Sequence, residues 1–466
     1  MLYFIIAGVA GVFLATLIIV LRKVFFEILE ASIGLANEVL SKEDEQIKQK
    51  NLIGALKRIL ISLGKMIIAI IIIIAGALLP LQAYSFFKGV SFESLDFSSV
   101  WFWVSLSIGS ILPFLLKKKK KVENYSEASM LLHKLILNNY NLSKFLFSFD
   151  KKFKKGEKIT SNSNFVIVSG LARAGTTSLT DQLFKAGSFS SLDYSNMPFL
   201  LAPNLWKKLY NPKKAKLTER KHGDNMMFGL NTIEALEEYF FKVFLNDSFI
   251  GDSTLIKHNI DKDVYDNYLK YQSLVRLSNN HLYLSKNNNL ILRYPSLRAH
   301  NKDFKAIFLF RKPEEHAHSL LNQHLRFSDF QKDDRDNFIE TYMNWLAHHE
   351  FGGNHKVFSF DEKPTEIKYD RDKLDYWLAV WQNYYRYLLT LDDSEFILLE
   401  YEDYLQAPKD VLLYLEAEMK MSFDYSNVKP FANKKTIDTS DCDPELLKST
   451  SETYAALKQR KVAFKS

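Results

Sequence analysis

The first quarter of the chain alternates long apolar runs with charged segments. Three runs lack any charged residue: 2–21, 66–83 and 97–116. Each is 18 or 20 residues long. At about 1.5 Å per residue, each can cross a hydrocarbon core of about 30 Å. We therefore predict three transmembrane helices within a membrane region of residues 1–121, followed by a second domain of residues 122–466.

Other interpretations of these runs exist. The second and third could be core helices of a soluble protein, although their length favours a membrane. The first could be a cleaved signal peptide. It has no positively charged start and no A-x-A cleavage site follows it, which favours an uncleaved anchor. Residues 24–61 have apolar positions at helical spacing, which predicts helices at the membrane surface or packed on the soluble domain.

Basic residues predict the orientation of this multi-pass region. The segment 22–65 holds eight Lys and Arg residues, the loop 84–98 holds only Lys88, and 117–121 is a run of five lysines. Basic residues gather on the cytoplasmic side, where the lysine run would touch anionic lipid. We expect 122–466 to face the cytoplasm, and a bacterial inner membrane suits that orientation.

After residue 122, short apolar runs alternate with helical patterns. The runs 164–169, 306–310 and 396–400 are apolar and rich in β-branched or aromatic residues, which is typical of buried parallel strands. Because helical stretches separate them, we predict an α/β fold: a P-loop-like parallel sheet with helices on both faces.

The first of these strands leads into a candidate phosphate loop. Gly170 and Gly175 bracket four residues, and a helix is predicted from Thr177. A strand, a glycine loop and a helix N-terminus favour an anion through backbone N–H groups and the helix dipole. Thr176 stands where a nucleoside-triphosphatase has lysine, which argues against ATP or GTP hydrolysis. Arg173 could supply the missing charge. An ordinary glycine turn is the alternative.

A second candidate anion site follows the strand at 306–310. Arg311 ends this strand, Pro313 suits the first turn of a helix, and Ser319 lies further along it. An arginine and a serine so placed can converge on one phosphate. A structural ion pair of Arg311 is the alternative. Two such sites in one domain point to a nucleotide with phosphate groups at two places.

Charge and cysteine content narrow the possible functions. Of the net charge of +7, most lies in residues 1–121, which carry 14 Lys and Arg against 8 Asp and Glu. The basic surplus therefore belongs to the membrane region, and we expect no nucleic-acid partner. The single cysteine, Cys442, excludes a disulfide framework and a multi-cysteine metal site.

The two anion motifs resemble those of the sulfotransferases that use 3′-phosphoadenosine 5′-phosphosulfate (PAPS). The segment Ala172–Thr177 is similar to the family's 5′-phosphosulfate loop, and Arg311, Pro313 and Ser319 to its 3′-phosphate motif. Ala172 and Ala174 depart from the family, which often has Pro and a hydroxyl residue there. The resemblance covers about residues 160–425. Weaker matches to the bacterial branch are Lys221–Asp224 with Glu234–Glu238, Leu284–Asn288 and Leu399–Asp403.

The resemblance implies roles for individual residues. The 5′ end of PAPS would be held by the loop and first helical turn: Arg173, Ala174, Gly175, Thr176, Thr177 and Ser178. Arg311 and Ser319 would bind the 3′-phosphate. Lys286 would neutralise the departing phosphate, unless it is a solvated surface lysine. A general base would be Glu237, Glu238 or His222, each of which could instead be structural.

Other side chains are candidates for the acceptor side of the site: Trp345, His348, His349 and Glu350. The H-E-x-x-H spacing of zinc enzymes is absent, and the family's transfer needs no metal. The resemblance thus implies a transferase that moves a sulfuryl group to a hydroxyl or amine. The apolar runs, which the resemblance does not cover, predict that it is membrane-anchored, and the anchor suggests a lipid or glycan as acceptor. A P-loop kinase or ATPase and a non-catalytic membrane scaffold with a nucleotide-binding fold are the alternatives.

Overall fold

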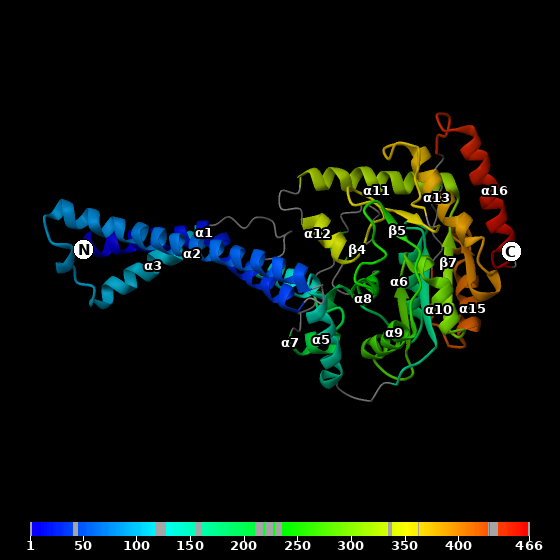
Figure 1. The fold of residues 1–466 in the computed structure, drawn as a ribbon, viewed down its shortest axis with the longest axis horizontal. Helices are drawn as coiled ribbons and strands as arrows, with labels where there is room; N and C mark the ends of the chain where they lie inside the picture. Colours follow the sequence, from blue (N-terminus) through cyan, green and yellow to red (C-terminus); the bar gives the residue numbers. More distant parts are fainter. Residues whose placement is uncertain are drawn as a thin grey trace. The chain divides into compact units, whose positions relative to one another are not determined.

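The protein is described here by a computed structural model. It covers residues 2–40, 45–116, 127–154, 160–209, 218–219, 227–228, 235–333, 338–361, 363–426, 428 and 437–464. The chain forms two compact units, residues 1–141 and 142–466 (Figure 1). The predicted lysine run at 117–121 and His222 lie outside the described residues.

The first unit is entirely helical in its described part. Its helices are α1 (Leu2–Leu40), α2 (Glu45–Lys88), α3 (Val100–Leu116) and α4 (Glu127–Leu137). Two of them contain segments long and apolar enough to cross a membrane, Leu2–Ser32 and Lys48–Lys88. The third predicted span corresponds to α3, which has 17 residues. At about 1.5 Å per residue it spans about 26 Å, at the lower limit for a core of about 30 Å. Length and composition alone therefore support two spans, and the third span stays a prediction.

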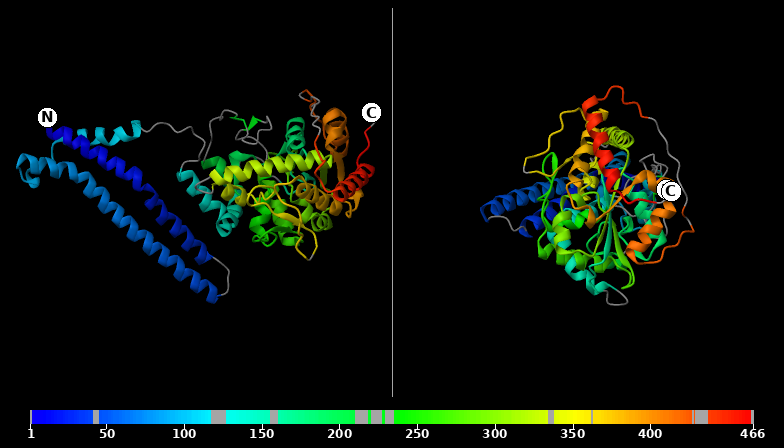
Figure 2. Two further views of the ribbon diagram at one scale, coloured as in Figure 1. Left: turned by 90° about the horizontal axis from the view of Figure 1, so that it is seen from above. Right: turned by 90° about the vertical axis from the view of Figure 1, so that its right-hand side faces the viewer.

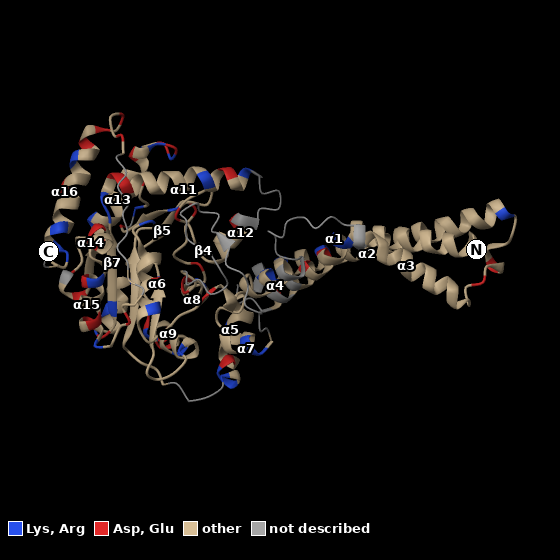
Figure 3. Ribbon diagram, turned by 180° about the vertical axis from the view of Figure 1, so that it is seen from behind, with Lys and Arg blue, Asp and Glu red and all other residues tan. Residues whose placement is uncertain are grey.

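The apolar helices of this unit expose most of their side chains. Only 22% and 17% of the most apolar windows of α1 and α2 are buried. Figure 3 shows that the parts of α1, α2 and α3 near the N-terminus carry almost no charge except around the connecting turn. A soluble protein buries such helices in its core, so the exposure of most of their apolar side chains suggests membrane association.

The region predicted to form helices at the membrane surface or packed on the soluble domain, 24–61, is helical in its described part and continues α1 and α2 without a break at the apolar boundary. Charged side chains hold these continuations together: Lys65 pairs with Glu27 at 2.8 Å, and Lys134 of α4 pairs with Glu30 at 2.8 Å. The predicted surface helices are thus the polar halves of a long helical hairpin, because the helical pattern runs uninterrupted from the apolar into the charged segments.

The apolar ends of α1 and α3 approach each other closely through small residues. A Cβ added to Gly109 would lie 1.9 Å from the backbone oxygen of Gly8, and one on Gly11 would lie 2.1 Å from that of Leu106. Glycines that let two backbones touch are typical of helix packing in membranes. The short helix α3 is therefore an integral part of this unit.

The second unit is built on a five-stranded parallel sheet. Its strands are β1 (Phe165–Gly170), β2 (Phe189–Ser190), β6 (Leu282–Lys286), β7 (Lys305–Phe310) and β9 (Ile397–Glu400), in the order β2-β6-β1-β7-β9. The strands predicted at 164–169, 306–310 and 396–400 are β1, β7 and β9, so the predicted α/β class is confirmed. Two small pairings accompany the sheet: β3 (Thr218–Glu219) with β4 (Met227–Phe228), and β5 (Thr254–Ile256) with β8 (Val357–Ser359).

Helices cover both faces of this sheet (Figures 1 and 2). On one face, α6 (Thr176–Ala186) and α15 (Pro408–Met419) pack their leucines against Val166, Val168 and Ile307. On the other, Tyr268 of α9 (Lys262–Val275) packs on Phe165, and α10 (Tyr294–His300) meets β7 through its first residue. The remaining helices are α5 (Tyr140–Asp150), α7 (Pro203–Leu209), α8 (Glu238–Phe244), α11 (Pro313–Asp333), α12 (Phe338–Trp345), α13 (Leu374–Leu388), α14 (Tyr401–Gln406) and α16 (Pro444–Arg460).

Candidate functional site

The phosphate loop lies between β1 and α6, at the carboxyl edge of the sheet. Gly175 caps α6 with a φ of 97°, and a Cβ there would lie 2.3 Å from the ring of Tyr401, so only glycine fits. Arg173 also has a positive φ of 72°. The first turn of α6, Thr176–Ser178, has N–H groups without acceptors inside the helix. The loop therefore has the backbone form of an anion site.

Helix α11 holds the phosphate loop in place. Arg173 Nε donates to Ser319 Oγ at 3.2 Å, and His316 Nε2 lies 2.7 Å from the carbonyl oxygen of Ala172. Burial lowers the pKa of His316 to about 3, so its imidazole is neutral and Nε2 carries the hydrogen that Ala172 accepts. The two motifs predicted from sequence, 5′ loop and 3′ motif, are thus in direct contact.

Arg311 follows β7 and is surrounded by two carboxylates and an aromatic ring. Its Nη2 pairs with Glu315 at 3.0 Å, its Nε lies 4.0 Å from Glu402, and its guanidinium lies 5.1 Å from the centre of the Tyr401 ring. Among the described residues, Nε is buried without a hydrogen-bond partner. A buried guanidinium with an unused N–H is a fitting receptor for a phosphate oxygen.

Glu402 is the titratable neighbour of this arginine. Its Oε1 accepts a hydrogen bond from the backbone N–H of Lys312 at 3.2 Å, and its Oε2 is buried without a partner among the described residues. Burial raises the pKa of Glu402 to about 7, opposed by the Lys312 hydrogen bond and by Arg311 and reinforced by Glu400. The charge beside Arg311 therefore changes near neutral pH.

Lys286 is the last residue of β6, next to β1, where it pairs in register with Val168. It is buried, with 8% of its surface exposed. The three asparagines after it, the Asn run (Asn287–Asn289), tie this strand end to its surroundings. Asn288 accepts from Thr176 Oγ1 at 3.4 Å and donates to Glu350 Oε1 at 3.1 Å, and Asn289 donates to the carbonyl of Ala347 at 3.4 Å.

Glu237 is buried in a hydrogen-bonded network behind the Asn run. It accepts from Tyr268 Oη at 2.6 Å and from Asn287 Nδ2 at 2.9 Å. Burial raises the pKa of Glu237, although these hydrogen bonds oppose the shift. Asn287 also donates its backbone N–H to Val168 at 2.9 Å, so Glu237 helps to hold the turn that carries Lys286.

Glu238 forms a buried bidentate ion pair with Arg293. The two donated hydrogen bonds are 2.8 and 2.5 Å long, and the side chains of Arg293 and Glu238 are 0% and 2% exposed. The guanidinium is also stacked between Phe241 and Phe249, at 4.1 and 5.1 Å from their ring centres. Both oxygens of Glu238 are thus occupied. That Glu237 or Glu238 is the base stays a prediction, and His222 lies outside the described residues.

The residues predicted on the acceptor side lie at the end of α12 and in the segment after it. Trp345 and His349 are buried, and His349 Nδ1 lies 3.0 Å from the carbonyl of Asn354. His348 and Glu350 are half-buried, and His348 Nε2 lies 3.3 Å from the carbonyl of Ala235. Within the described parts of the chain, no cluster of three His, Cys, Asp or Glu residues could hold a metal ion.

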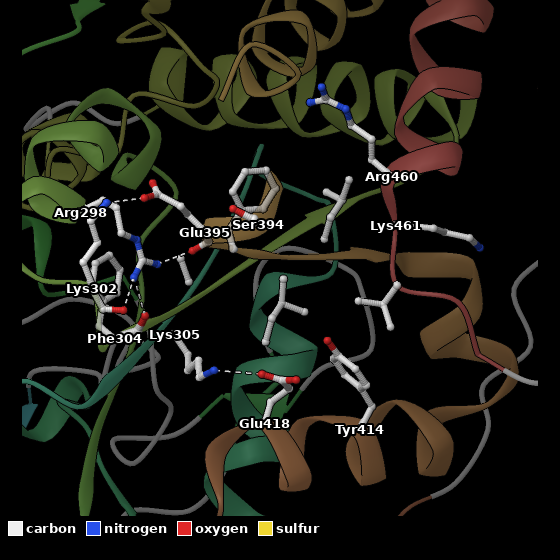
Figure 4. A pocket seen from close by; sticks show the side chains of 15 residues that line it. Arg298, Lys302, Phe304, Lys305, Ser394, Glu395, Tyr414, Glu418, Arg460 and Lys461 are labelled. Carbon is white, nitrogen blue, oxygen red and sulfur yellow. Dashed lines mark hydrogen bonds and ion pairs between the residues drawn. The ribbon is translucent and has the colours of Figure 1, made fainter. Parts of the chain in front are cut away.

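A polar pocket lies at the opposite, amino edge of β7 and β9 (Figure 4). Its cations already have partners: Lys302 pairs with Glu395, Lys305 pairs with Glu418 at 2.9 Å, and Arg298 donates to three backbone carbonyls. Because the phosphate loop opens at the carboxyl edge, this pocket is separate from the candidate site, and its internal pairing gives it a structural role.

Sequence reasoning missed two elements of this site. The Asn run was noted only as the neighbourhood of Lys286, although three consecutive asparagines after a strand are a usable signal, since each amide can link two segments. His316 was not singled out at all. It lies three residues before Ser319 on the same helix, and this spacing indicates that both face the same loop, but its buried, neutral state depends on the packed structure.

Comparison with known proteins adds only a fold-level likeness. No family model matches the chain, and no curated protein matches it. Among solved structures, a sulfotransferase from Mycobacterium avium is 14% identical, over 80% of this chain and 94% of that one, with a TM-score of 0.38. One from Mycobacterium tuberculosis is 13% identical, over 71% and 82%, with a TM-score of 0.34. The sulfotransferase domain from the curacin biosynthetic pathway is 14% identical, over 66% and 94%, with a TM-score of 0.30. At such values these likenesses carry no argument, and function has to be argued from the site.

The Glu238–Arg293 pair gives a prediction about stability. Glu238→Ala leaves Arg293 buried without its partner, so we expect the free energy of unfolding to fall by about 3–5 kcal/mol. Asp266→Ala, which breaks an exposed pair with Lys262, is the control and should change it by less than about 1 kcal/mol. Urea unfolding of the full chain in detergent measures both. Equal, small losses would show that the buried pair does not hold α8.

Proposed function

We propose that this chain is a membrane-anchored sulfotransferase that moves a sulfuryl group from PAPS to a hydroxyl or amine, with a membrane lipid or glycan as acceptor. The observation that carries this proposal is the contact between the two anion motifs, Arg173 with Ser319, at the edge where β6 presents Lys286. This supplies fixed positive groups for both ends of a nucleotide that carries phosphate at two places.

In this proposal, each group of residues has its own role. The first turn of α6 and Arg173 hold the 5′ phosphosulfate, while Arg311 and Ser319 hold the 3′-phosphate. The acceptor oxygen or nitrogen attacks the sulfur in line, and the bond from sulfur to the bridging oxygen breaks. Lys286 neutralises the charge that grows on the leaving phosphate. The donors of β1, β6 and β7 are held by a rigid sheet, which is the kind of pre-organisation that such a transfer needs.

The alternatives fit the site less well. A kinase or ATPase needs the lysine that Thr176 replaces, and Lys286 comes from a different strand. Magnesium-dependent nucleotide binding would favour a kinase or ATPase. A non-catalytic scaffold has no need for Arg173, Lys286 and Arg311, which are all present. Binding of PAPS without any transfer would favour the scaffold.

The proposed orientation has all three apolar runs cross the membrane and so puts residues 122–466, with the whole second unit, in the cytoplasm of a bacterial cell, since basic residues concentrate in 22–65 and 117–121. We expect protease added to sealed inside-out vesicles to digest this unit, and protease added to right-side-out vesicles to leave it intact. Immunoblotting with an antibody against the C-terminus reads the result. Protection in inside-out vesicles would reverse the orientation.

Arg311 should distinguish nucleotides with a 3′-phosphate from those without one. A hydrogen bond to a charged group is worth about 1.5–3 kcal/mol, so Arg311→Ala should weaken binding of 3′-phosphoadenosine 5′-phosphate by about ten- to a hundredfold. Binding of adenosine 5′-phosphosulfate, which lacks the 3′-phosphate, should change little. Isothermal titration calorimetry measures both affinities.

Arg326→Ala is the matched control, because Arg326 lies on α11, the helix that begins two residues after Arg311, with its guanidinium over Phe330. It should leave both affinities unchanged. An equal loss of affinity for the two nucleotides in Arg311→Ala would show that Arg311 does not read the 3′-phosphate.

Glu402 makes this affinity depend on pH. Above its pKa of about 7 the carboxylate is charged and repels a phosphate at Arg311; below it the group is neutral. Affinity for 3′-phosphoadenosine 5′-phosphate should therefore fall as pH rises from 6 to 8, by up to about tenfold, which is one pKa unit of coupling. Calorimetry at several pH values measures it.

Glu402→Gln separates this effect from the titration of the ligand. The 3′-phosphate itself gains negative charge near pH 6, which acts in the opposite direction. The variant keeps that contribution and loses the carboxylate, so it should bind more tightly than wild type at pH 8 and equally at pH 6. Parallel pH curves for the two proteins would exclude Glu402 from the 3′-phosphate site.

A further inference from the structure

The general base has to combine an available lone pair with access to the acceptor. Glu237 and Glu238 are only 2% and 1% exposed, and both carboxylates accept hydrogen bonds from buried side chains. His348 and Glu350 are half-buried and lie on the segment that the Asn run ties to Lys286 and Thr176. The structure thus brings a second, more accessible pair of titratable groups to the phosphate loop.

The hydrogen bond of His348 assigns its tautomer. Nε2 faces the carbonyl oxygen of Ala235 at 3.3 Å, and a carbonyl can only accept. Nε2 therefore carries the hydrogen, and in a neutral imidazole Nδ1 then holds the lone pair. Two hydrogen bonds fix the backbone of this segment. The N–H of His348 donates to the carbonyl of Met343 at 2.9 Å, and the carbonyl of Ala347 accepts from Asn289.

The charged groups around His348 come from three places. Burial lowers the pKa of His348 and the cation Lys286 on β6 lowers it further, while Glu350 on the same loop and Glu238 on α8 raise it. The imidazole is consequently neutral at neutral pH and ready to accept a proton. Once it is charged, two carboxylates stabilise it.

We propose that His348 is the general base of the transfer and that Glu350 is a positioning residue, which stabilises the imidazolium and, through Asn288, keeps it in register with the phosphate loop. This rests on the proposed sulfotransferase function. It replaces the expectation that Glu237 or Glu238 takes the proton, and it gives those two glutamates the role of holding Asn287 and Arg293.

The transfer forms one bond to sulfur, breaks another and moves one proton. The acceptor oxygen forms a bond to sulfur, and its proton passes to Nδ1 of His348. The bond between sulfur and the bridging oxygen breaks, and its electron pair stays on the 5′-phosphate next to Lys286. The products are a sulfate ester and 3′-phosphoadenosine 5′-phosphate. The proton then leaves His348 for solvent, which its partial exposure allows.

The test compares His348→Gln, Glu350→Gln and Glu237→Gln in the full chain in detergent. Transfer of labelled sulfuryl from PAPS to a bacterial lipid extract, and to water as a second acceptor, is measured from pH 5 to 9. Binding of 3′-phosphoadenosine 5′-phosphate is measured by calorimetry. His348→Gln should lose about 10²–10⁴-fold in turnover, lose the acidic limb of the pH profile and bind the nucleotide as wild type does. His300→Gln is the control, because His300 Nε2 also faces a carbonyl, that of Ile260, but precedes the amino end of β7.

Glu350→Gln gives an independent readout. Without this carboxylate the pKa of His348 falls, so the acidic limb should move to lower pH, which loss of structure alone would not produce. This variant decides the question if His348→Gln does not fold: a shifted limb supports the proposal and an unchanged limb overturns it. Full activity of His348→Gln, or loss of the limb in Glu237→Gln, also overturns it. A wild-type protein that neither binds the nucleotide nor transfers sulfuryl would instead refute the proposed function, and the base assignment with it.

Discussion

The parallel register of β6, β1 and β7 is the constraint on which the rest of the site depends. Because all three strands run in the same direction, their carboxyl ends meet at one edge. Lys286, the phosphate loop and Arg311 follow these three ends, although more than 130 residues separate the first glycine of the loop from Arg311. In the proposed function each contributes one part of an anion site, and none of them needs a long loop to reach it.

Burial of charge at this edge explains the hydrogen-bonding pattern behind it. A buried carboxylate without partners is strongly unfavourable, so Glu237 and Glu238 are found with two donors each. These partners are Tyr268 on α9, Asn287 in the turn after β6 and Arg293, the residue before α10. The two glutamates therefore fix the segments that carry Lys286 and the Asn run. The position of Glu237 and Glu238 in a predicted motif is therefore as consistent with this structural role as with catalysis.

More of the fold than of the site could be predicted from the sequence. Buried parallel strands are continuous apolar runs, and this pattern located β1, β7 and β9 to within a residue. The helices α1 and α2 are longer than the apolar runs predicted. An apolar run marks the part of a helix that suits lipid, but it does not mark where the helix ends. The partner of Glu238 is Arg293, 55 residues away, and no helical pattern reveals such a contact. Tautomers and shifted pKa values, as for His316 and His348, follow from packing alone.

In the proposed function, selectivity for a nucleotide charged at both ends would follow from the internal partners of the two arginines. In the free protein Arg311 is paired with Glu315, and Arg173 donates to Ser319. A phosphate at the 3′ site has to compete with the carboxylates of Glu315 and Glu402 at Arg311, so a single charge there gains little. A ligand with anions at both ends also gains the N-terminus of α6 and Lys286, and the Arg173–Ser319 contact holds the two subsites at a fixed separation. Competition from Glu315 and Glu402 therefore works against ligands with one phosphate group more than against those with two, and this discrimination needs no contact with the base or the sugar.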